Sequence, residues 1–283
     1  MAVTQRDLDW WHGLDKTWQR VFMLHLYYKD EIGMNYYKDE FFDKLNLDNL
    51  TDYQDILKVK ALKHIDFQSW LGDYKIKDLS PLRELTQLEF LSLEEHWIED
   101  LSPLAGLTSL RKLYLSRNRI KDFSVLEKLS LERLAVAENP LDGPFDLRLI
   151  AKHRRLRFLD ASRCALKDLT PLRNLTELTD LYLAYNNIFD IAVMFRFTQL
   201  ERLDLSHNHV FDISPLIHLH HLEDLNLSYN YNEFERLYLL ETMQHLRTLS
   251  IQGNGINEET RVWLNRALPR CEIHFKDQSS API

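Results

Sequence analysis

A repeat of 22 residues in the segment 156–221 restricts what this chain can fold into more than any other feature. Written as three lines that begin at Leu156, Leu178 and Leu200, the segment places apolar residues in columns 1, 4, 6, 11, 14, 17 and 20 of every line. One such unit cannot bury its own apolar face, so units of this kind stack on their neighbours. The repeat therefore predicts a solenoid.

The same pattern extends over most of the chain, in about nine coils of one repeat each. The other coils begin at Leu62, Leu88, Leu110, Leu131, Leu222 and Leu246. Columns 1, 4 and 6 alternate as in a short strand, and columns 11 to 20 return the chain on the other side. We expect an α/β solenoid shaped as a horseshoe, with a parallel sheet on its concave face. The first coil carries an insertion, Ser69–Lys75, whose role the pattern leaves open.

Column 9 carries mostly asparagine, directly after each predicted strand. Its residues are Trp70, His96, Asn118, Asn139, Cys164, Asn186, Asn208, Asn230 and Asn254. The side chain of asparagine offers both a donor and an acceptor to backbone groups that a sharp turn points inward. We predict a structural ladder of hydrogen bonds here.

A second recurring motif is Ser-Pro or Thr-Pro, which an aspartate precedes by two residues. It occurs at Ser80, Ser102, Thr170 and Ser214. We expect the hydroxyl to cap a short helical turn that proline begins, and the aspartate to bind the turn backbone. A cation held by the stacked aspartates is the alternative.

The motif x-D-L-S-P-L-x-x-L-x-x-L-x-x-L-x-L-x-x-N resembles internalin-type leucine-rich repeats and the related phosphatase-regulator-like class of 22-residue repeats. The resemblance covers about residues 57–275. It implies a curved solenoid that binds another protein on its concave strand face. Internalins are exported and often carry wall or linker segments, and this sequence shows neither.

The segments outside the repeat predict two caps and a tail. We expect a helical N-terminal cap over 1–56, a solenoid over 57–254, a helix-strand C-terminal cap over 255–275 and a flexible tail over 276–283. Terminal repeats need such caps because an open solenoid end exposes its core.

The composition limits the classes of partner and the cellular compartments that suit this chain. The net charge of −8 disfavours nucleic acid and anionic membranes. The sequence shows no signal peptide and no apolar run long enough to cross a bilayer. The two cysteines lie at least four coils apart, beyond disulfide reach, which favours a reducing compartment. We therefore expect a cytoplasmic protein, and a monomer.

The residues of the concave face vary from coil to coil, whereas the buried columns are almost uniformly apolar. The features specific to this chain therefore lie on the concave face. Exposed aromatic and arginine side chains are typical of binding hot spots. The candidate partner-binding residues are Phe90, Tyr114, Arg117, Phe158, Asp160, Arg163, Tyr182, Tyr185, Asp204, His207 and Tyr229.

We predict no catalytic residue, no metal site and no cofactor. The sequence has no glycine-rich phosphate loop and no nucleophile elbow. The histidines at 218, 220 and 221 fall on the return side and lack companions at metal-ligand spacing. The predicted function is a non-enzymatic protein-interaction module that binds an unidentified partner protein. The alternative is an inhibitor or immunity-type protein that blocks the active site of an enzyme or toxin, as the ribonuclease-inhibitor family does with a related fold.

Overall fold

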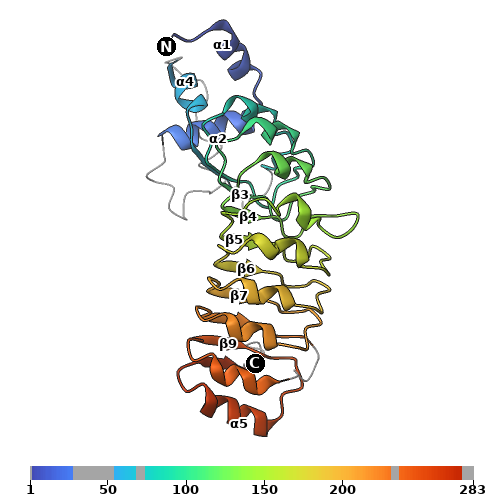
Figure 1. The fold of residues 1–283 in the computed structure, drawn as a ribbon. Coiled ribbons are helices and arrows are strands. Elements are labelled where there is room, and N and C mark those ends of the chain that lie inside the picture. Colours follow the sequence, from blue (N-terminus) through green and yellow to red (C-terminus); the bar gives the residue numbers. More distant parts are fainter. Residues whose placement is uncertain (1, 28–53, 68–73, 231–235, 276–283) are drawn as a thin grey trace, which may run out of the picture. The chain divides into compact units, whose positions relative to one another are not determined.

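The structure is a computed structural model that describes residues 2–27, 54–67, 74–230 and 236–275 (Figure 1). The chain divides into two compact units, residues 1–131 and 132–283. Among the described residues, no helix combines the length and apolarity needed to cross a membrane. Most of the insertion in the first coil, with Trp70, and the predicted tail lie outside the described residues.

The first unit contains helices followed by the first coils of the repeat. Its α-helices and strands are α1 (Gln5–His12), α2 (Lys16–Tyr27), α4 (Gln54–Lys60), β1 (His64–Asp66), β2 (Phe90–Ser92) and β3 (Lys112–Tyr114). Its 3-10 helices are Ser80–Glu84, Ser102–Gly106 and Ser124–Lys128. The strands pair in parallel and in chain order, with His64 beside Phe90 and Phe90 beside Lys112.

Helix α2 binds the first coil through two side chains. The indole Nε1–H of Trp18 donates to the carbonyl of Asp78 at 2.8 Å. The N–H of Asp66, in the first strand of the sheet, donates to Nε2 of His25 at 3.0 Å. An edge strand exposes unpaired backbone groups, so this bond satisfies one donor of β1. Trp11 and Trp18 are both buried and belong to the core of this unit.

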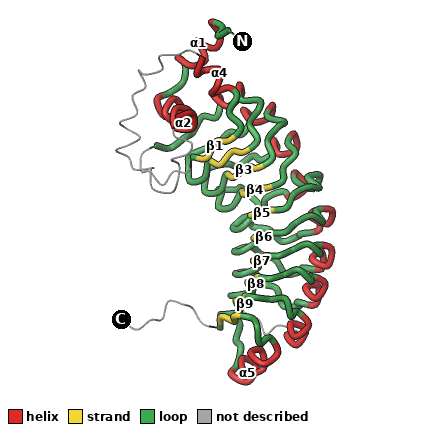
Figure 2. Tube along the Cα trace, turned by 90° about the vertical axis from the view of Figure 1, so that its left-hand side faces the viewer, coloured by secondary structure: helices red, strands yellow, loops and turns green. Residues whose placement is uncertain are grey.

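The second unit continues the parallel sheet pattern to the C-terminal helix. Its strands are β4 (Arg133–Ala135), β5 (Phe158–Asp160), β6 (Asp180–Tyr182), β7 (Arg202–Asp204), β8 (Asp224–Asn226), β9 (Thr248–Ser250) and β10 (Glu272–His274). Its helices are the 3-10 helices Leu147–Leu149, Thr170–Asn174, Ala192–Arg196, Ser214–His218 and Leu237–Thr242 and the α-helix α5 (Glu258–Ala267). Figure 2 shows the strands on one side of these coils and the 3-10 helices on the other. The predicted α/β solenoid is therefore confirmed within each unit.

The apolar columns form the core of each coil. In the sixth coil all seven of them are at most 1% exposed: Leu178, Leu181, Leu183, Ile188, Ile191, Met194 and Phe197. Burying one such side chain contributes about 1.5–3 kcal/mol. Stacked coils share this burial, because each leucine also packs on the coils before and after it.

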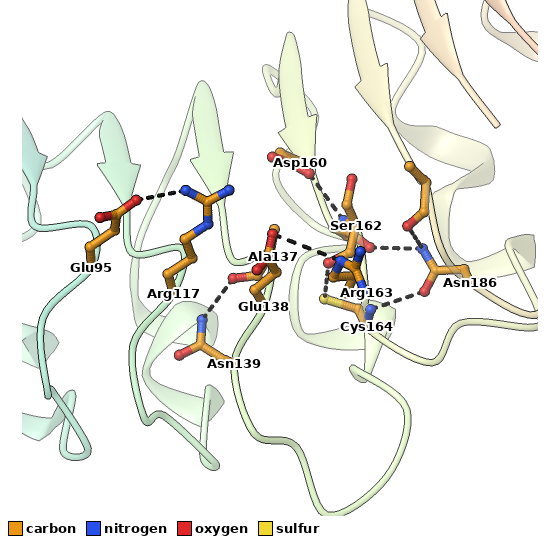
Figure 3. Close-up of polar contacts among 12 residues, drawn as sticks. Glu95, Arg117, Ala137, Glu138, Asn139, Asp160, Ser162, Arg163, Cys164 and Asn186 are labelled. Carbon is orange, nitrogen blue, oxygen red and sulfur yellow. Dashed lines mark hydrogen bonds and ion pairs between the residues drawn. The ribbon is translucent and has the colours of Figure 1, made fainter. Parts of the chain in front are cut away.

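The asparagine ladder of column 9 is confirmed. Oδ1 of Asn186 accepts hydrogen bonds from the N–H groups of Cys164 (3.0 Å) and Leu166 (2.9 Å) in the preceding coil (Figure 3). Its amide donates to the carbonyls of Ala161 (3.0 Å) and Leu183 (2.9 Å). Asn186 therefore satisfies buried backbone groups of its own coil and of the preceding one.

Column 9 tolerates cysteine at 164 because the preceding coil is longer. In that coil the N–H of Leu141 donates to the carbonyl of Asn139 (2.9 Å). The N–H of Phe145 donates to the carbonyl of Cys164 (2.9 Å). Backbone carbonyls accept from both of these N–H groups, so neither needs a side-chain acceptor. Cysteine, which lacks the amide oxygen of asparagine, can therefore occupy column 9 of the next coil.

The predicted capping by Ser and Thr hydroxyls is wrong. The residue before each Ser-Pro or Thr-Pro helix makes no side-chain cap hydrogen bond. The aspartate two residues before the Ser or Thr caps the helix instead. Oδ1 of Asp78 accepts from the N–H of Ser80, and Oγ of Ser80 donates to Oδ2 of Asp78. A carboxylate reaches the first N–H of the helix because its side chain turns back on its own backbone.

Three local features depart from the regular repeat. In the fourth coil a short helix starts at Leu147 and is capped by Asp146. In the eighth coil the return is the longer 3-10 helix Leu237–Thr242. In α5 the buried residue is Leu264, whereas Val262 is 43% exposed.

Ala165 tests the backbone strain of the coil turns. It is exposed and has φ of 54°, in the left-handed region that disfavours a Cβ atom. Ala165→Gly should raise the free energy of unfolding by about 1 kcal/mol. Urea denaturation followed by circular dichroism measures this change. The matched control is Ala192→Gly in a 3-10 helix, which should lower stability by about 0.5–1 kcal/mol; a loss in both variants would contradict the strain.

Candidate functional site

The second unit presents one continuous polar and aromatic surface over its strands. We call it the strand face: the side chains of columns 3, 5 and 8 in coils four to eight. Register aligns these columns from coil to coil, with Phe158 beside Asp180 and Asp180 beside Arg202. The leucine between columns 3 and 5 points into the core, so its two neighbours point to the opposite side.

The candidate residues of the sequence divide between the two units. Phe90, Tyr114 and Arg117 belong to the first unit, and the other eight belong to the second. Of these eight, Arg163 and Tyr185 are exposed and six are half-buried: Phe158, Asp160, Tyr182, Asp204, His207 and Tyr229. All eight lie on the strand face.

Column 7, apart from the half-buried Ser162, does not line this surface although it also follows the strand. Ser206 is 5% exposed, Ser228 is 2% exposed and Ala137 is 5% exposed. The chain turns inward after each strand, so these side chains pack beneath the turn. Their small size reflects the space available there.

Every described residue of column 8 has a left-handed backbone, which the sequence did not reveal. The positive φ angles of this column are those of Glu95 (62°), Arg117 (57°), Glu138 (55°), Arg163 (56°), Tyr185 (56°), His207 (53°) and Tyr229 (56°). Such a conformation costs a residue with a Cβ about 1–2 kcal/mol, and glycine avoids this cost. The ninth coil has Gly253 (φ 72°) at the equivalent place, which was the one sequence signal.

Four column-8 side chains of the second unit form a stack that we call the column-8 stack. The guanidinium of Arg163 lies 3.8 Å from the ring centroid of Tyr185. The Tyr185 and His207 rings are 3.9 Å apart at 9°, and the His207 and Tyr229 rings are 4.4 Å apart at 13°. A Cβ added at Gly253 would lie 2.4 Å from the Tyr229 ring, so that ring closes over the glycine.

Column 3 alternates charges along the strand face. The Arg133 guanidinium lies 4.3 Å from the Phe158 ring centroid. Arg202 bonds to Asp180 through Nη1, and its Nε lies 3.8 Å from Oδ2 of Asp224. The sequence contained a signal for these ion pairs, because neighbouring repeats carry opposite charges in the same column. Our candidate residues did not include Asp180, Arg202 or Asp224.

Column 5 places an aromatic ring between two carboxylates. Asp160 pairs with Tyr182 in register, and Tyr182 pairs with Asp204. Burial raises the pKa of Asp160, and the charges of Asp204 and Glu138 raise it further. Burial also raises the pKa of the Tyr182 hydroxyl, followed by the effect of nearby carboxylates. The local potential at this place is therefore negative.

The first unit carries its own shorter set of face contacts. The rings of His64 and Phe90 stack at 4.0 Å, and Phe90 and Tyr114 lie 5.5 Å apart. Nη1 of Arg117 bonds Oε1 of Glu95 at 2.6 Å (Figure 3). The three candidates of this unit are thus already engaged with neighbours in adjacent coils.

The described part of the chain contains no group of three or more His, Cys, Asp or Glu side chains arranged to hold a metal ion. Each repeat aspartate instead accepts the N–H two residues ahead, as Asp168 does from Thr170 at 2.8 Å. The thiols of Cys164 and Cys271 are both free. Burial raises their pKa to about 12 and about 11, which keeps them protonated and weakly nucleophilic.

Comparison with known proteins agrees with the repeat. Residues 86–128 match the family model described as leucine-rich repeats in two copies, and residues 242–259 match a single leucine-rich repeat. No curated protein matches the sequence closely enough to count as a relative.

Several solved structures share the fold. A leucine-rich-repeat protein of Leptospira interrogans is 24% identical with a TM-score of 0.67, over 78% of this chain and 57% of its own length. An internalin C2 of Listeria monocytogenes is 24% identical with a TM-score of 0.57, over 67% of this chain and 82% of its own. The Arabidopsis receptor kinase HAESA, solved with the peptide hormone IDA and the co-receptor SERK1, is 20% identical with a TM-score of 0.54. That match covers 69% of this chain and 38% of HAESA.

This chain thus spans little more than half of the Leptospira protein. The likeness in these structures concerns the fold. The repeat itself is present in the sequence, in the coils of both units and in the matching family models. The chain is therefore a leucine-rich-repeat protein.

Proposed function

We propose that this chain is a non-enzymatic protein-binding module that holds a partner protein on the strand face of its second unit. The column-8 stack carries this proposal. Four large side chains keep left-handed backbone where glycine would avoid the strain, and their rings and guanidinium lie at the surface. Residues with strained backbone angles of this kind are found most often at functional sites, where the side chain itself is needed.

The composition of the strand face supports a protein partner. Tyrosine and arginine are the residues most enriched in binding hot spots, and both occur in the column-8 stack. Stacking holds their rings in place, so little side-chain entropy remains to be lost on binding. The similar fold of HAESA was solved with a peptide hormone and a co-receptor, so the fold can present a protein-binding surface.

Charge and thiol chemistry add two further proposals. The net charge of −8 makes nucleic acid an unfavourable partner. Two free thiols suit a reducing compartment, and we propose that the protein works in the cytoplasm as a monomer.

Removing the centre of the column-8 stack should weaken binding strongly while the fold stays intact. In Tyr185→Gly/His207→Gly, glycine also relieves the positive φ at both positions, so thermal stability should change little. The affinity for the partner should fall about 30-fold or more, which corresponds to about 2 kcal/mol. The measurement is affinity capture from the native lysate, followed by titration of the captured protein against each variant.

The control removes two aromatic rings from the opposite side of the coils. Phe195 and Tyr238 are 50% and 62% exposed on 3-10 helices, so Phe195→Ala/Tyr238→Ala should retain full affinity. Equal binding by the stack variant and the wild-type chain would refute a role for the strand face. If the captured partner is an enzyme that loses activity in the complex, the module acts as an inhibitor.

A further inference from the structure

The charges of the strand face do not cancel, and two of its carboxylates lie outside its ion pairs. Its acidic residues are Glu138, Asp160, Asp180, Asp204 and Asp224, and its basic residues are Arg133, Arg163 and Arg202. Five acidic minus three basic residues leave two negative charges. Arg202 pairs with Asp180 and Asp224, and Nε of Arg163 lies 3.9 Å from Glu138. These ion pairs include every acidic residue of the strand face except Asp160 and Asp204.

Neither of these two carboxylates has a cation within 4.0 Å in the part of the chain that the structure describes. Oδ1 of Asp160 accepts from the N–H of Ser162 at 3.0 Å (Figure 3), and Oδ1 of Asp204 accepts from the N–H of Ser206 at 2.8 Å. Oδ2 of Asp204 accepts only from the side-chain amide of Asn226, at 3.2 Å. Their partners are thus neutral.

The fold does not need a negative charge at these places. In the next coil Asn226 occupies column 5, and its Oδ1 accepts from the N–H of Ser228 at 3.1 Å. An amide oxygen therefore holds the same turn that the carboxylates of Asp160 and Asp204 hold. The two charges remain unexplained by local structure.

Tyr182 lies between these carboxylates without a cation on its ring. Other rings of the strand face carry a guanidinium from this chain: Arg133 lies over Phe158, and Arg163 lies over Tyr185. No such contact involves Tyr182 among the described residues. Strands spaced about 4.8 Å apart place Asp160 and Asp204 about 10 Å from each other, on either side of the ring.

We propose that the row Asp160–Tyr182–Asp204 receives an arginine or lysine side chain from a basic segment of the partner protein, an inference that rests on the proposed function of the strand face. The cation lies against the Tyr182 ring and forms an ion pair with one carboxylate, as the chain's own arginines do on neighbouring rings. Two carboxylates outside the ion pairs of the face accommodate two basic residues of one segment. Complementary charge at such a site raises specificity and the rate of association.

The test selects peptides from a displayed library of random dodecapeptides, on the wild-type chain and on Asp160→Asn/Asp204→Asn. The substitution keeps the turn hydrogen bonds, as Asn226 shows, and removes the charges together with the hydrogen bond from the Asn226 amide to Oδ2 of Asp204. We expect the wild-type chain to enrich peptides with arginine or lysine and the double variant to lose that enrichment. Selected basic peptides should bind the double variant at least about 10-fold more weakly, and added salt should reduce the difference.

The matched control is Glu127→Gln/Glu241→Gln, which changes the net charge equally at exposed positions on 3-10 helices. It should bind the selected peptides within about twofold of the wild-type affinity. The proposal is overturned if the wild-type chain enriches no basic peptides, or if both double variants bind them equally. Peptides that bind through the column-8 stack but are apolar or acidic would overturn only this inference and leave the proposed function standing.

Discussion

Asn186→Ala should lower the free energy of unfolding by about 4 kcal/mol. The substitution removes the one acceptor that the described residues offer to two buried donors, the N–H groups of Cys164 and Leu166. Each buried donor left without a partner costs about 1–3 kcal/mol. The carbonyl of Ala161 loses the amide that binds it from the next coil. Urea denaturation followed by circular dichroism measures the change.

The neighbouring asparagine is the matched control. Asn187 is exposed, and only its backbone N–H bonds, to the carbonyl of Leu166 at 2.8 Å. Asn187→Ala should therefore change stability by less than about 0.5 kcal/mol. A similar small effect for Asn186→Ala would mean that water replaces the ladder and that column 9 contributes little to stability.

Acid should destabilise the first unit through His96, which occupies column 9 in place of asparagine. Its Nε2–H donates to the carbonyl of Phe67 at 2.7 Å, and its Nδ1 accepts from the N–H of Ile76 at 3.2 Å. Only the neutral ring can do both. Burial lowers the pKa of His96 from 6.5 to about 4.

The sign of the effect follows from this lowered pKa. Between about pH 6.5 and pH 4 the unfolded chain binds a proton that the folded chain excludes, so stability falls as the pH falls through this window. A lowering from 6.5 to about 4 corresponds to a loss of about 3 kcal/mol. Above pH 6.5 the full stability is present, and below pH 4 this contribution stays constant.

His96→Asn isolates this contribution, because asparagine fills the same role in the neighbouring coils. Asn118, for example, accepts from the N–H of Ile98 and donates to the carbonyl of Leu93. The stability difference between the wild-type chain and the variant should shift by about 3 kcal/mol in favour of the variant between pH 7.5 and pH 4. Burial also lowers the pKa of His25, which is present in both proteins and cancels in the comparison. Parallel acid dependence in the two proteins would contradict a neutral His96.

The repeat predicted most of the fold because each column repeats one local environment. Leucine recurs wherever the chain points into the core, and asparagine recurs wherever the turn leaves inward backbone groups, as at Asn186. The helix and the strand that the sequence predicted within 255–275 also formed, as Glu258–Ala267 and Glu272–His274. The predictions were wrong where either of two side chains could form the hydrogen bond that caps a helix, as with Asp78 and Ser80.

The sequence predicted which residues lie on the strand face but not which of them contact one another. The alternation of residues along a strand placed Tyr182 and Asp204 on the surface from the sequence alone. Their partners depend on side-chain directions in neighbouring coils, such as the pairing of Arg202 with Asp180. Column spacing carries no information about those directions.

By itself, the sequence determined the period, the buried columns and the parallel order of the strands, because these follow from local spacing repeated along the chain. Tertiary structure alone decided the left-handed turn at column 8, the burial of column 7 and the absence of Asp160 and Asp204 from the ion pairs of the strand face among the described residues. The physical reason is that backbone angles and charge pairing depend on atoms brought together by stacking. Those atoms belong to residues 22 or more positions apart in the chain.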